Sequence, residues 1–409
     1  MTPLSVSVVV VSRHRPAELL RCLSAIRQLQ HPMFEVVVVT CPAGLRSVNS
    51  LPFADGMKIV PFDRPNISAA RNMGISHAAG DIVAFIDDDA VPDAFWLHHL
   101  TAPAHHLSVA AMGGFVRGRN GISYQWRAQT LDEYGGAVAL DLEGDNPVVL
   151  TPPEGRAIKT EGTNMAVRRD TLIALGGFDE AFTYFLDDTD LNMRLAQTGH
   201  ATALIPQAEV YHSSAENSTR RADRAPLDLF DIGASWAVFQ RKHVAQSARM
   251  DHWSDLREGQ RKRMLRHLQA GTLEPRDVRN LMARLDAGYA EGATRPTDQG
   301  RLGVEPFAPF KQMPQAFTEI AVLHGRVWSA SRLKAEAAQL VQKNRRTYLI
   351  LLSPTMIFHR FRFNGGGYWV QSGGLFGKSV RSEPIFRWHR YATRIRKETM
   401  RLFANHPKC

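Results

Sequence analysis

Two clusters of aspartates carry the side chains in this sequence that are best suited to chemistry. Asp87, Asp88 and Asp89 directly follow an apolar run at residues 82–86. Adjacent carboxylates repel one another and resist burial unless a positive charge compensates them. In an extended chain Asp87 and Asp89 point to one side and Asp88 to the other. This pattern suits a divalent cation held by oxygen ligands and shared with a diphosphate, although a solvated acidic turn has the same composition.

The second cluster contains Asp187, Asp188 and Asp190. In a helix, Asp190 and Arg194 form an i, i+4 pair, which on its own indicates a surface salt bridge. Asp187 and Asp188 then lie at the helix start, where the helix dipole stabilises carboxylates. The functional alternative is a general base, because a carboxylate beside a hydroxyl can accept its proton while that hydroxyl attacks an electrophile.

These clusters need a scaffold, and the first half of the chain alternates strand and helix patterns. Apolar, mostly β-branched runs predict strands at 6–11, 36–39, 58–60 and 82–86. Leucine and isoleucine spacing predicts a helix from residue 16 to about 26, and a second helix is predicted at 68–79. The alternation indicates an α/β fold with a mostly parallel sheet and helices on both faces. Open sheets of this kind bind ligands at the carboxyl ends of their strands, which is where Asp87 lies.

The order of several short segments resembles the family-2 glycosyltransferases of the GT-A fold, over roughly residues 5–215. Each segment is weak alone, but their order and spacing are specific. The matching segments are 8–16 (opening strand and turn), 65–75 (Asn…Ala-Arg-Asn-x-Gly), 81–89 (strand and DxD), 162–169 and 176–180 (acceptor side), 187–194 (Asp-Asp-x-Asp-Leu…Arg), and 210–212 (strand ending in His).

The resemblance implies a metal-dependent transfer of a sugar from a nucleotide-sugar donor to an acceptor hydroxyl, with inversion at the anomeric carbon. Asp87 and Asp89 would hold Mg²⁺ or Mn²⁺ on the donor diphosphate, with His212 as a third metal contact. Asp188 would be the base that deprotonates the acceptor. Further residues carried over are Ser12, Arg15, Arg71 and Asp88 toward the donor, and Asn164 and Asp190 on the acceptor side.

Two departures from the family pattern leave assignments open. The second strand often ends in an acidic residue that binds the nucleotide base, but here it ends Thr40-Cys41-Pro42. Asp63 is the candidate substitute. The Glu-Asp pair of the family reads Asp187-Asp188 here, so either residue can be the base.

Charge divides the 409-residue chain in two. Residues 1–220 carry 17 Lys+Arg and 24 Asp+Glu, so this half is acidic. Residues 221–409 carry 33 Lys+Arg and 16 Asp+Glu, so this half is strongly basic and gives the whole chain its net charge of +10. We therefore predict a catalytic domain at 1–220 and a basic, mainly helical accessory region at 221–409, with a loop or linker at 292–303.

The basic region admits three partners: a phosphate-rich acceptor such as a lipid-linked diphosphate sugar, an anionic membrane surface, or nucleic acid. Basic and aromatic side chains together suit a membrane interface and also stacking on single-stranded nucleic acid. The resemblance to enzymes that act on glycans ranks a membrane or a lipid-linked acceptor above nucleic acid, and a solvated helix face is the plain alternative. The C-terminal cluster comprises Lys378, Arg381, Arg387, Arg390, Arg394, Arg396, Lys397 and Arg401, with Trp369, Phe386, Trp388 and Tyr391 among them.

Three cysteines and no apolar run of spanning length favour a cytoplasmic protein, peripheral on the inner face of the cytoplasmic membrane. By fold-level analogy, the product would be a bacterial surface polysaccharide or related glycan. Two other functions stay open. A nucleotidyltransferase would carry a glycine-rich basic loop after the first strand, and residues 12–16 contain no glycine. A non-catalytic sugar-nucleotide-binding module would use the acidic clusters only for structure.

Overall fold

The apolar run at the start of the chain forms the centre of a ten-stranded sheet. In the computed structural model, which describes residues 4–213, 219–221, 223–298 and 302–406, β1 (Val6–Ser12) lies between two strands and is parallel to both. The order across the sheet is β10-β13-β6-β12-β4-β1-β2-β3, with β5 beside β13 and β7 beside β6. The other strands are β2 (Phe34–Thr40), β3 (Lys58–Pro61), β4 (Ile82–Asp87), β5 (Ala90–Pro92), β6 (Val109–Arg117), β7 (Tyr124–Trp126), β10 (Val148–Leu150), β12 (Met165–Arg168) and β13 (Ala201–His212).

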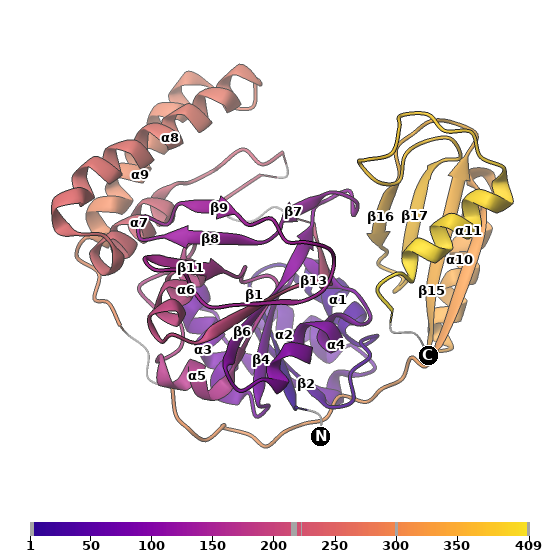
Figure 1. The fold of residues 1–409 in the computed structure, drawn as a ribbon, viewed down its shortest axis with the longest axis horizontal. Coiled ribbons are helices and arrows are strands. Elements are labelled where there is room, and N and C mark those ends of the chain that lie inside the picture. The colour runs from indigo at the N-terminus through magenta and orange to yellow at the C-terminus, as the bar shows by residue number, and fades with distance from the viewer. Residues whose placement is uncertain (1–3, 214–218, 222, 299–301, 407–409) are drawn as a thin grey trace.

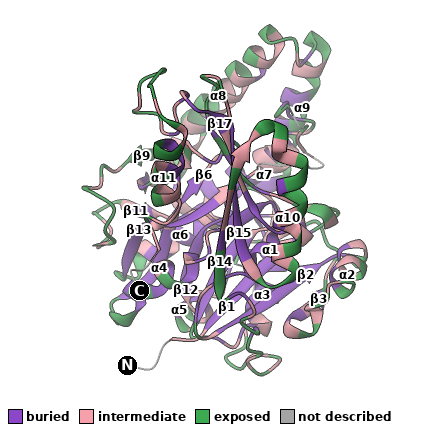
Figure 2. Ribbon diagram, turned by 90° about the vertical axis from the view of Figure 1, so that its right-hand side faces the viewer, coloured by how far each residue is buried: buried purple, intermediate pink, exposed green. Residues whose placement is uncertain are grey.

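Helices cover both faces of this sheet, because successive side chains of its strands point to opposite sides. Val8 and Val10 of β1 pack with α1 and α4 on one face, whereas Val9 packs with α3, α5 and α6 on the other. Figure 2 shows the central strands buried between these layers. The fold class predicted for this part is confirmed. The helices are α1 (Pro16–Ile26), α2 (Pro42–Asn49), α3 (Ile67–His77), α4 (Trp96–Thr101), α5 (Arg169–Ala174) and α6 (Asp187–Gln197).

A small sheet and three helices extend this part on one side (Figure 1). The sheet has the order β11-β8-β9, with β8 (Gln129–Asp132), β9 (Ala137–Ala139) and β11 (Arg156–Lys159). The helical arm consists of α7 (Phe230–His243), α8 (Arg249–Gln269) and α9 (Pro275–Gly292). One apolar core joins this arm to Leu131, Phe182 and Leu186. The boundary at residue 220 stays a prediction.

The C-terminal unit, residues 319–406, adds a sheet that the sequence analysis did not predict. Its order is β14-β15-β17-β16, and β14, β15 and β17 are parallel to one another. The helices predicted for this region are present, so the region is both helical and sheet-forming. The elements are β14 (Glu319–Arg326), α10 (Ala330–Gln342), β15 (Arg345–Ser353), β16 (Arg360–Phe363), β17 (Trp369–Gly374) and α11 (Tyr391–Leu402).

An extended segment connects the arm to the C-terminal unit. After α9 ends at Gly292, residues 302–318 run across the bottom of the molecule in Figure 1 without helix or strand. The loop or linker predicted at 292–303 stays a prediction, and residues 299–301 of it lie outside the described part of the chain. Among the described residues, the longest helices are too polar to cross a bilayer.

Candidate active site

The acidic run at the end of β4 is neutralised by groups from the end of β1. The Ser12 hydroxyl donates to Asp88 Oδ2 at 2.7 Å, and the Arg15 guanidinium donates to the other oxygen of the same carboxylate. Arg15 Nη1 also lies 3.4 Å from Asp89 Oδ2. Burial raises the pKa of Asp88 to about 7, although Arg15 and Ser12 oppose that rise. Asp88 is fully buried, so it holds Arg15 in place and does not face a ligand.

Asp87, Asp89 and His212 form a group with the donor set of a divalent cation site. Antiparallel pairing places His212 of β13 opposite Ala90, immediately after the acidic run. His212 Nε2 lies 3.0 Å from Asp89 Oδ1, and one potential ligand atom from each of these three residues lies within 4.8 Å of the others. Burial alone would lower the pKa of His212, but the hydrogen bond and the charge of Asp89 raise it.

The donor types fit the expected metal. Carboxylate oxygens suit Mg²⁺ and Mn²⁺ alike, and an imidazole nitrogen is more typical of a transition metal than of Mg²⁺. Neighbouring side chains also fix the orientation of the imidazole. His212 Nδ1 lies 3.3 Å from Gln125 Oε1, and the Trp126 ring stacks on the imidazole with ring centroids 5.9 Å apart. A ring oriented through its second nitrogen is the usual arrangement of a histidine ligand.

Arg71 links the two acidic clusters. It lies on α3, which begins after Asn66 because the Asn66 side chain accepts the backbone N–H of Ala69. The buried Arg71 guanidinium bonds to Asp187 and lies 3.4 Å from Asp87 Oδ1. The sequence analysis placed Arg71 toward the donor phosphate, whereas here its charge is balanced by carboxylates of both clusters.

Asp187 and Asp188 begin α6, as predicted, but their environments differ. Two residues with positive φ precede the helix, Phe185 at 72° and Leu186 at 66°. Asp187 is buried against Arg71, and burial raises its pKa to about 6 even though Arg71 opposes the rise. Asp188 is half-buried, and its Oδ2 accepts the backbone N–H of Gly162 at 2.9 Å.

Glu161 is a titratable neighbour that the sequence analysis missed. Its carboxylate pairs with Lys159 at 2.7 Å, just before the segment that contacts Asp188. Burial, followed by the charge of Asp188, raises the pKa of Glu161 to about 7. An isolated glutamate after a short strand carries no sequence signal, so only the folded structure reveals this pairing of acids.

The structure places the two residues expected on the acceptor side, Asn164 and Asp190, in the interior. Asn164 is fully buried, donates to the carbonyls of Phe115 and Ala208, and accepts from Trp96 Nε1. Asp190 is also fully buried. It pairs with Arg194 at 2.8 Å, as predicted from spacing, and additionally with Lys242 and His243 of α7. Burial alone would raise the pKa of Asp190, but the hydrogen bond with His243 and the charges of Arg194 and Lys242 hold it well below its usual range. Both side chains are bonded to other parts of the scaffold, and their expected acceptor-side role stays a prediction.

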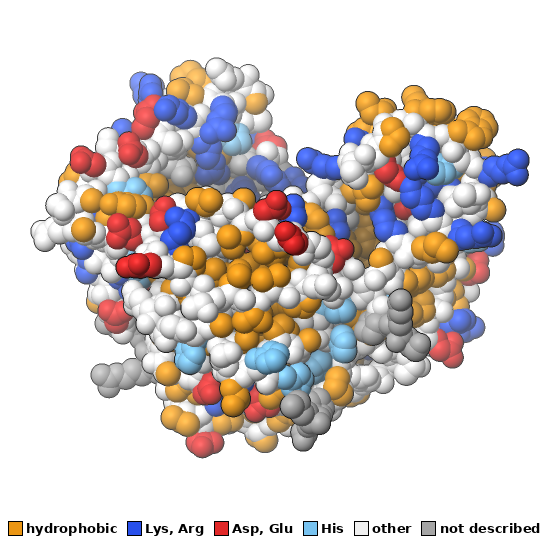
Figure 3. Space-filling view, in the orientation of Figure 1, with side chains coloured by type: hydrophobic (Ala, Val, Ile, Leu, Met, Phe, Trp, Pro, Cys, Tyr) orange, Lys and Arg blue, Asp and Glu red, His pale blue; other side chains and the backbone are white. Residues whose placement is uncertain are grey.

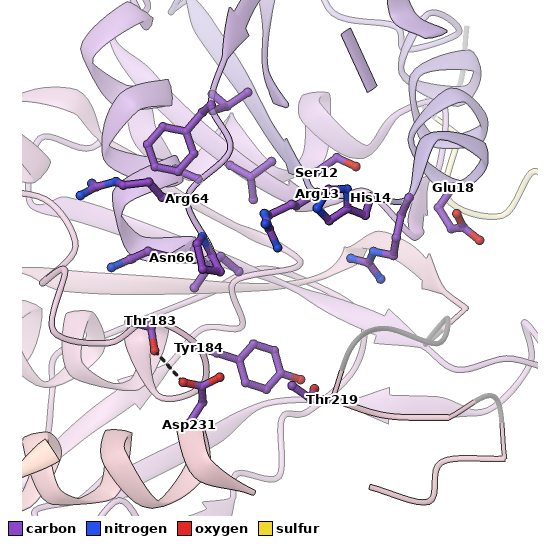
Figure 4. Close-up of a pocket in the computed structure, with 17 residues that line it drawn as sticks. Ser12, Arg13, His14, Glu18, Arg64, Asn66, Thr183, Tyr184, Thr219 and Asp231 are labelled. Atoms are coloured by element: carbon purple, nitrogen blue, oxygen red, sulfur yellow. Dashed lines mark hydrogen bonds between the residues drawn. The ribbon is translucent and has the colours of Figure 1, made fainter. Parts of the chain in front are cut away.

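A cavity of about 530 Å³, lined in part by Ser12 and Arg15, opens at the carboxyl ends of β1 and β2. Figure 4 shows that the turn with Ser12, Arg13 and His14 faces Thr183, Tyr184 and Asp231 across it. Asp63 stands near its rim and is paired with Arg13 at 2.9 Å. Asp63, His14 and Cys41 also lie together, a grouping that the sequence analysis did not make. A cavity of this size accommodates a nucleotide-sized ligand.

Comparison with known proteins gives a family match to the first half of the chain. Residues 3–225 match the family described as "Glycosyltransferase like family 2". The chain is similar to O-antigen biosynthesis protein RfbC of Myxococcus xanthus, at 28% identity over 58% of this chain and 19% of that protein. It is also similar to succinoglycan biosynthesis protein ExoM of Rhizobium meliloti, at 27% identity over 52% of this chain and 68% of that protein. The chain therefore spans only a fifth of the first relative.

A solved structure of S. aureus TarS, residues 1–349 in complex with UDP-GlcNAc, aligns with a TM-score of 0.43 at 15% identity. The alignment covers 60% of this chain and 69% of that one.

Proposed function

This chain belongs to glycosyltransferase-like family 2, and from that membership we propose that it transfers a sugar from a nucleotide-sugar donor to an acceptor hydroxyl, with metal dependence and with inversion at the anomeric carbon. The observation that carries the proposal is the grouping of Asp87, Asp89 and His212, which Arg71 links to Asp187 at the start of α6. Arg15, which pairs with Asp89, lines a nucleotide-sized cavity next to this group. Convergent acids at the carboxyl edge of a sheet serve phosphate and proton chemistry together.

The cavity is the proposed donor site. Arg13 and His14 line the cavity and would contact the nucleotide base and ribose, together with Asp63, which pairs with Arg13. Arg15 lines the cavity and pairs with Asp89 of the acidic run. Asp87, Asp89 and His212 would hold Mn²⁺ or Mg²⁺. When bound, the cation neutralises charge on the diphosphate that leaves.

Asp188 is the proposed base. Among the described residues no cation pairs with its second oxygen, which accepts from the Thr189 hydroxyl at 3.3 Å, and the Gly162 N–H orients the carboxylate. Asp187 is the weaker candidate, because it is buried and bonded to Arg71. We assign Asp187 to positioning Arg71 between the clusters.

The acceptor is proposed to be a glycan or a lipid-linked glycan of a bacterial surface polysaccharide. The named roles of the two relatives, in O-antigen and in succinoglycan biosynthesis, support this class of product. A lipid-linked acceptor lies in a membrane, so the proposal includes a cytoplasmic location on the inner membrane face. Nucleic acid is not part of it.

The test is metal-dependent donor turnover. We expect release of nucleoside diphosphate from one member of a nucleotide-sugar panel when Mn²⁺ is present, and loss of that release in EDTA. A nucleotidyltransferase would instead release pyrophosphate from a nucleoside triphosphate and a sugar phosphate. A binding module would bind the donor and turn over neither.

The metal site is tested separately with Asp89→Asn, which keeps the shape of the side chain and removes its charge. We expect loss of the Mn²⁺-dependent rise in melting temperature with nucleotide-sugar, because ligand binding to the native state stabilises it by mass action. Asp55→Asn, at an exposed position after α2, is the matched control. Full activity of Asp89→Asn in EDTA would refute the metal role.

A further inference from the structure

The three parallel strands of the C-terminal unit end at one edge. β14, β15 and β17 run side by side in the same direction, so the segments that follow Arg326, Ser353 and Gly374 emerge together. In Figure 1 this edge is the top of the right-hand unit, because β14 enters from the extended segment at the bottom. These segments supply every residue of the surface described next.

The edge carries a group of exposed apolar side chains that we call the apical patch. Trp328 and Trp388 are each 72% exposed, which is unusual for the largest apolar side chain. Figure 3 shows apolar atoms gathered at the top of this unit. Contiguous exposed apolar surface marks an interaction site more often than chance exposure does. The apical patch consists of Val327, Trp328, Met356, Ile357, Phe358, Ile385, Phe386 and Trp388.

The patch is built into the fold. The Trp388 ring stacks on Phe376 with centroids 4.9 Å apart, and the Gly374 N–H donates to the Ile357 carbonyl at 2.8 Å. A Cβ at Gly377 would lie 2.1 Å from the Ile357 carbonyl oxygen, so the loops approach each other as closely as glycine allows. The apolar side chains are therefore held outward by a packed base.

Basic side chains surround the patch. Lys378 Nζ lies 4.9 Å from the centre of the Phe358 ring, and the Arg326 guanidinium lies 5.9 Å from that of Trp328. Residues 319–406 contain sixteen Lys and Arg residues against four Asp and Glu. Of those acids, Glu383 pairs with Lys397, and Glu398 is buried beside Arg394. The exposed basic residues that flank the patch in sequence are Arg360, Arg381, Arg387 and Arg390.

We propose that the apical patch inserts into the interface of an anionic lipid bilayer and that its basic rim binds the lipid headgroups. Tryptophan and phenylalanine partition into the membrane interface, and Lys and Arg beside them reach anionic headgroups while their stems contact apolar surface. Two of the residues in the predicted C-terminal cluster take no part, because Arg394 and Trp369 are buried. The contact surface is formed by the loops that follow β14, β15 and β17 rather than by a face of α11.

The direction in which the apical patch faces, relative to the central sheet, suits the proposed reaction. β1 starts near the N-terminus at the bottom of Figure 1, so the carboxyl edge of the central sheet points the same way as the apical patch. A bilayer against the patch would lie on the side of the molecule that carries the candidate active site. This placement of a lipid-linked acceptor rests on the proposed function, whereas membrane binding itself does not.

The experiment measures co-sedimentation of the full chain with phosphatidylcholine vesicles, with and without phosphatidylglycerol. We expect binding only with the anionic lipid, and its loss in high salt. Trp328→Ser/Ile357→Ser/Trp388→Ser should weaken binding at least tenfold, which is on the order expected for removing inserted apolar groups. Arg387→Glu/Arg390→Glu should abolish the preference for anionic vesicles.

Matched controls carry the same changes at exposed positions elsewhere. Leu107→Ser/Met250→Ser/Val304→Ser and Lys262→Glu/Arg279→Glu should bind as the native sequence does. An unchanged donor-induced shift in melting temperature shows that each variant is folded and keeps its donor site. Equal, weak binding to both vesicle types overturns the proposal, as does equal loss in the controls. A patch variant that abolishes self-association, with vesicle binding unchanged, assigns the patch to a second copy of the chain.

Discussion

Asp187 and Asp188 are neighbours in sequence, yet the fold gives them opposite properties. Asp187 points into the protein and neutralises Arg71, and Asp188 is oriented by a backbone N–H at the open side. Sequence alone cannot separate two adjacent acids at a helix start, since both fit the helix dipole. The difference arises because α3, far away in the chain, delivers a guanidinium to only one of them.

This difference predicts that substitution of Asp188 lowers the transfer rate, whereas substitution of Asp187 lowers the stability. Asp188→Asn keeps the shape but cannot accept a proton, so transfer should fall by about 10²–10⁴-fold with donor affinity nearly unchanged. Asp187→Asn removes the closer of the two carboxylates that neutralise the buried Arg71, leaving only Asp87 at 3.4 Å, and should cost up to roughly 3–5 kcal/mol of stability. Steady-state kinetics and chemical unfolding of both variants separate the effects. An active, stable Asp188→Asn beside a folded but inactive Asp187→Asn would exchange the two roles.

Glu161 predicts a pH dependence of stability. Its pKa is raised from an ordinary 4.5 to about 7, so between these values the folded state holds a proton that the unfolded chain releases. The free energy of unfolding should therefore decrease as pH rises through this window, by about 1.4 kcal/mol for each pH unit crossed. Urea unfolding of the protein and of Glu161→Gln should show a flatter profile for the variant. Parallel profiles would mean that Glu161 is charged throughout.

At the scale of elements, the loop before β12 sets the spacing between α3 and α6. Gly162 donates its N–H to Asp188, and a Cβ there would lie 2.6 Å from Arg71 Nη2. Contacts under 3.0 Å force a neighbour to move. Glycine at this position therefore lets one loop hold the candidate base and pass closely beside the arginine that joins the acidic clusters.

Gly162→Ala should consequently lower the transfer rate, because either Arg71 or the loop must shift. A displacement of this size can cost about a hundredfold in rate. The matched control is Gly259→Ala in α8, where nothing lies within 4 Å of an added Cβ. That change should raise stability by roughly 0.5–1 kcal/mol and leave the rate unaltered. Equal rates for the two variants would show that the Gly162 loop does not position the site.

Strands and helices with a strong hydrophobic pattern could be predicted from the sequence, and those with a weak hydrophobic pattern could not. The apolar runs of β1, β2 and β4, and the spacing of Leu19 and Leu23, identify a parallel sheet and its helix directly. The β15 run at Thr347 is similar, but its partner β14 is half-exposed with a mixed pattern, and α10 separates the two. Pairing across such a crossover depends on packing that a single strand does not encode.

At the scale of the molecule, the charge split predicts two parts with different tasks that divide at residue 220, and this division stays a prediction. In the structure the helical arm shares a core with the first part, and the C-terminal unit is attached through residues 302–318. Residues 302–318 cross the edge of the central sheet, and the Lys311 N–H donates to the buried Glu35 carboxylate at 2.8 Å. The same carboxylate accepts from Ser7 and pairs with Lys58. A glutamate near the start of an apolar strand has no evident role in sequence, because its partners come from four distant segments, at Ser7, Lys58, Ala79 and Lys311.

Met313 is the apolar anchor of this connection. Its side chain is 1% exposed within the core that contains Phe34 and Met57, and its N–H donates to the Phe34 carbonyl at 2.8 Å. The connection then leads into β14, so the position of the C-terminal unit depends on this attachment. Other attachments include the bond from Gln28 to the Gly367 carbonyl and the edge-to-face contact of Tyr211 with Phe361.

Met313→Ala should therefore cost about 2–5 kcal/mol, as for other buried methionines. It should also expose the connecting segment to protease at concentrations that leave the native protein intact, since cleavage follows local opening. Met250→Ala, at an exposed position in α8, controls for loss of a methionine. If Met313→Ala keeps donor turnover but loses vesicle binding and lipid-dependent transfer, the connecting segment holds the apical patch in a fixed position relative to the active site. If Met313→Ala unfolds and is cleaved like the control, residues 302–318 are only a tether, and other contacts, among them those of Gln28 and Tyr211, orient the C-terminal unit.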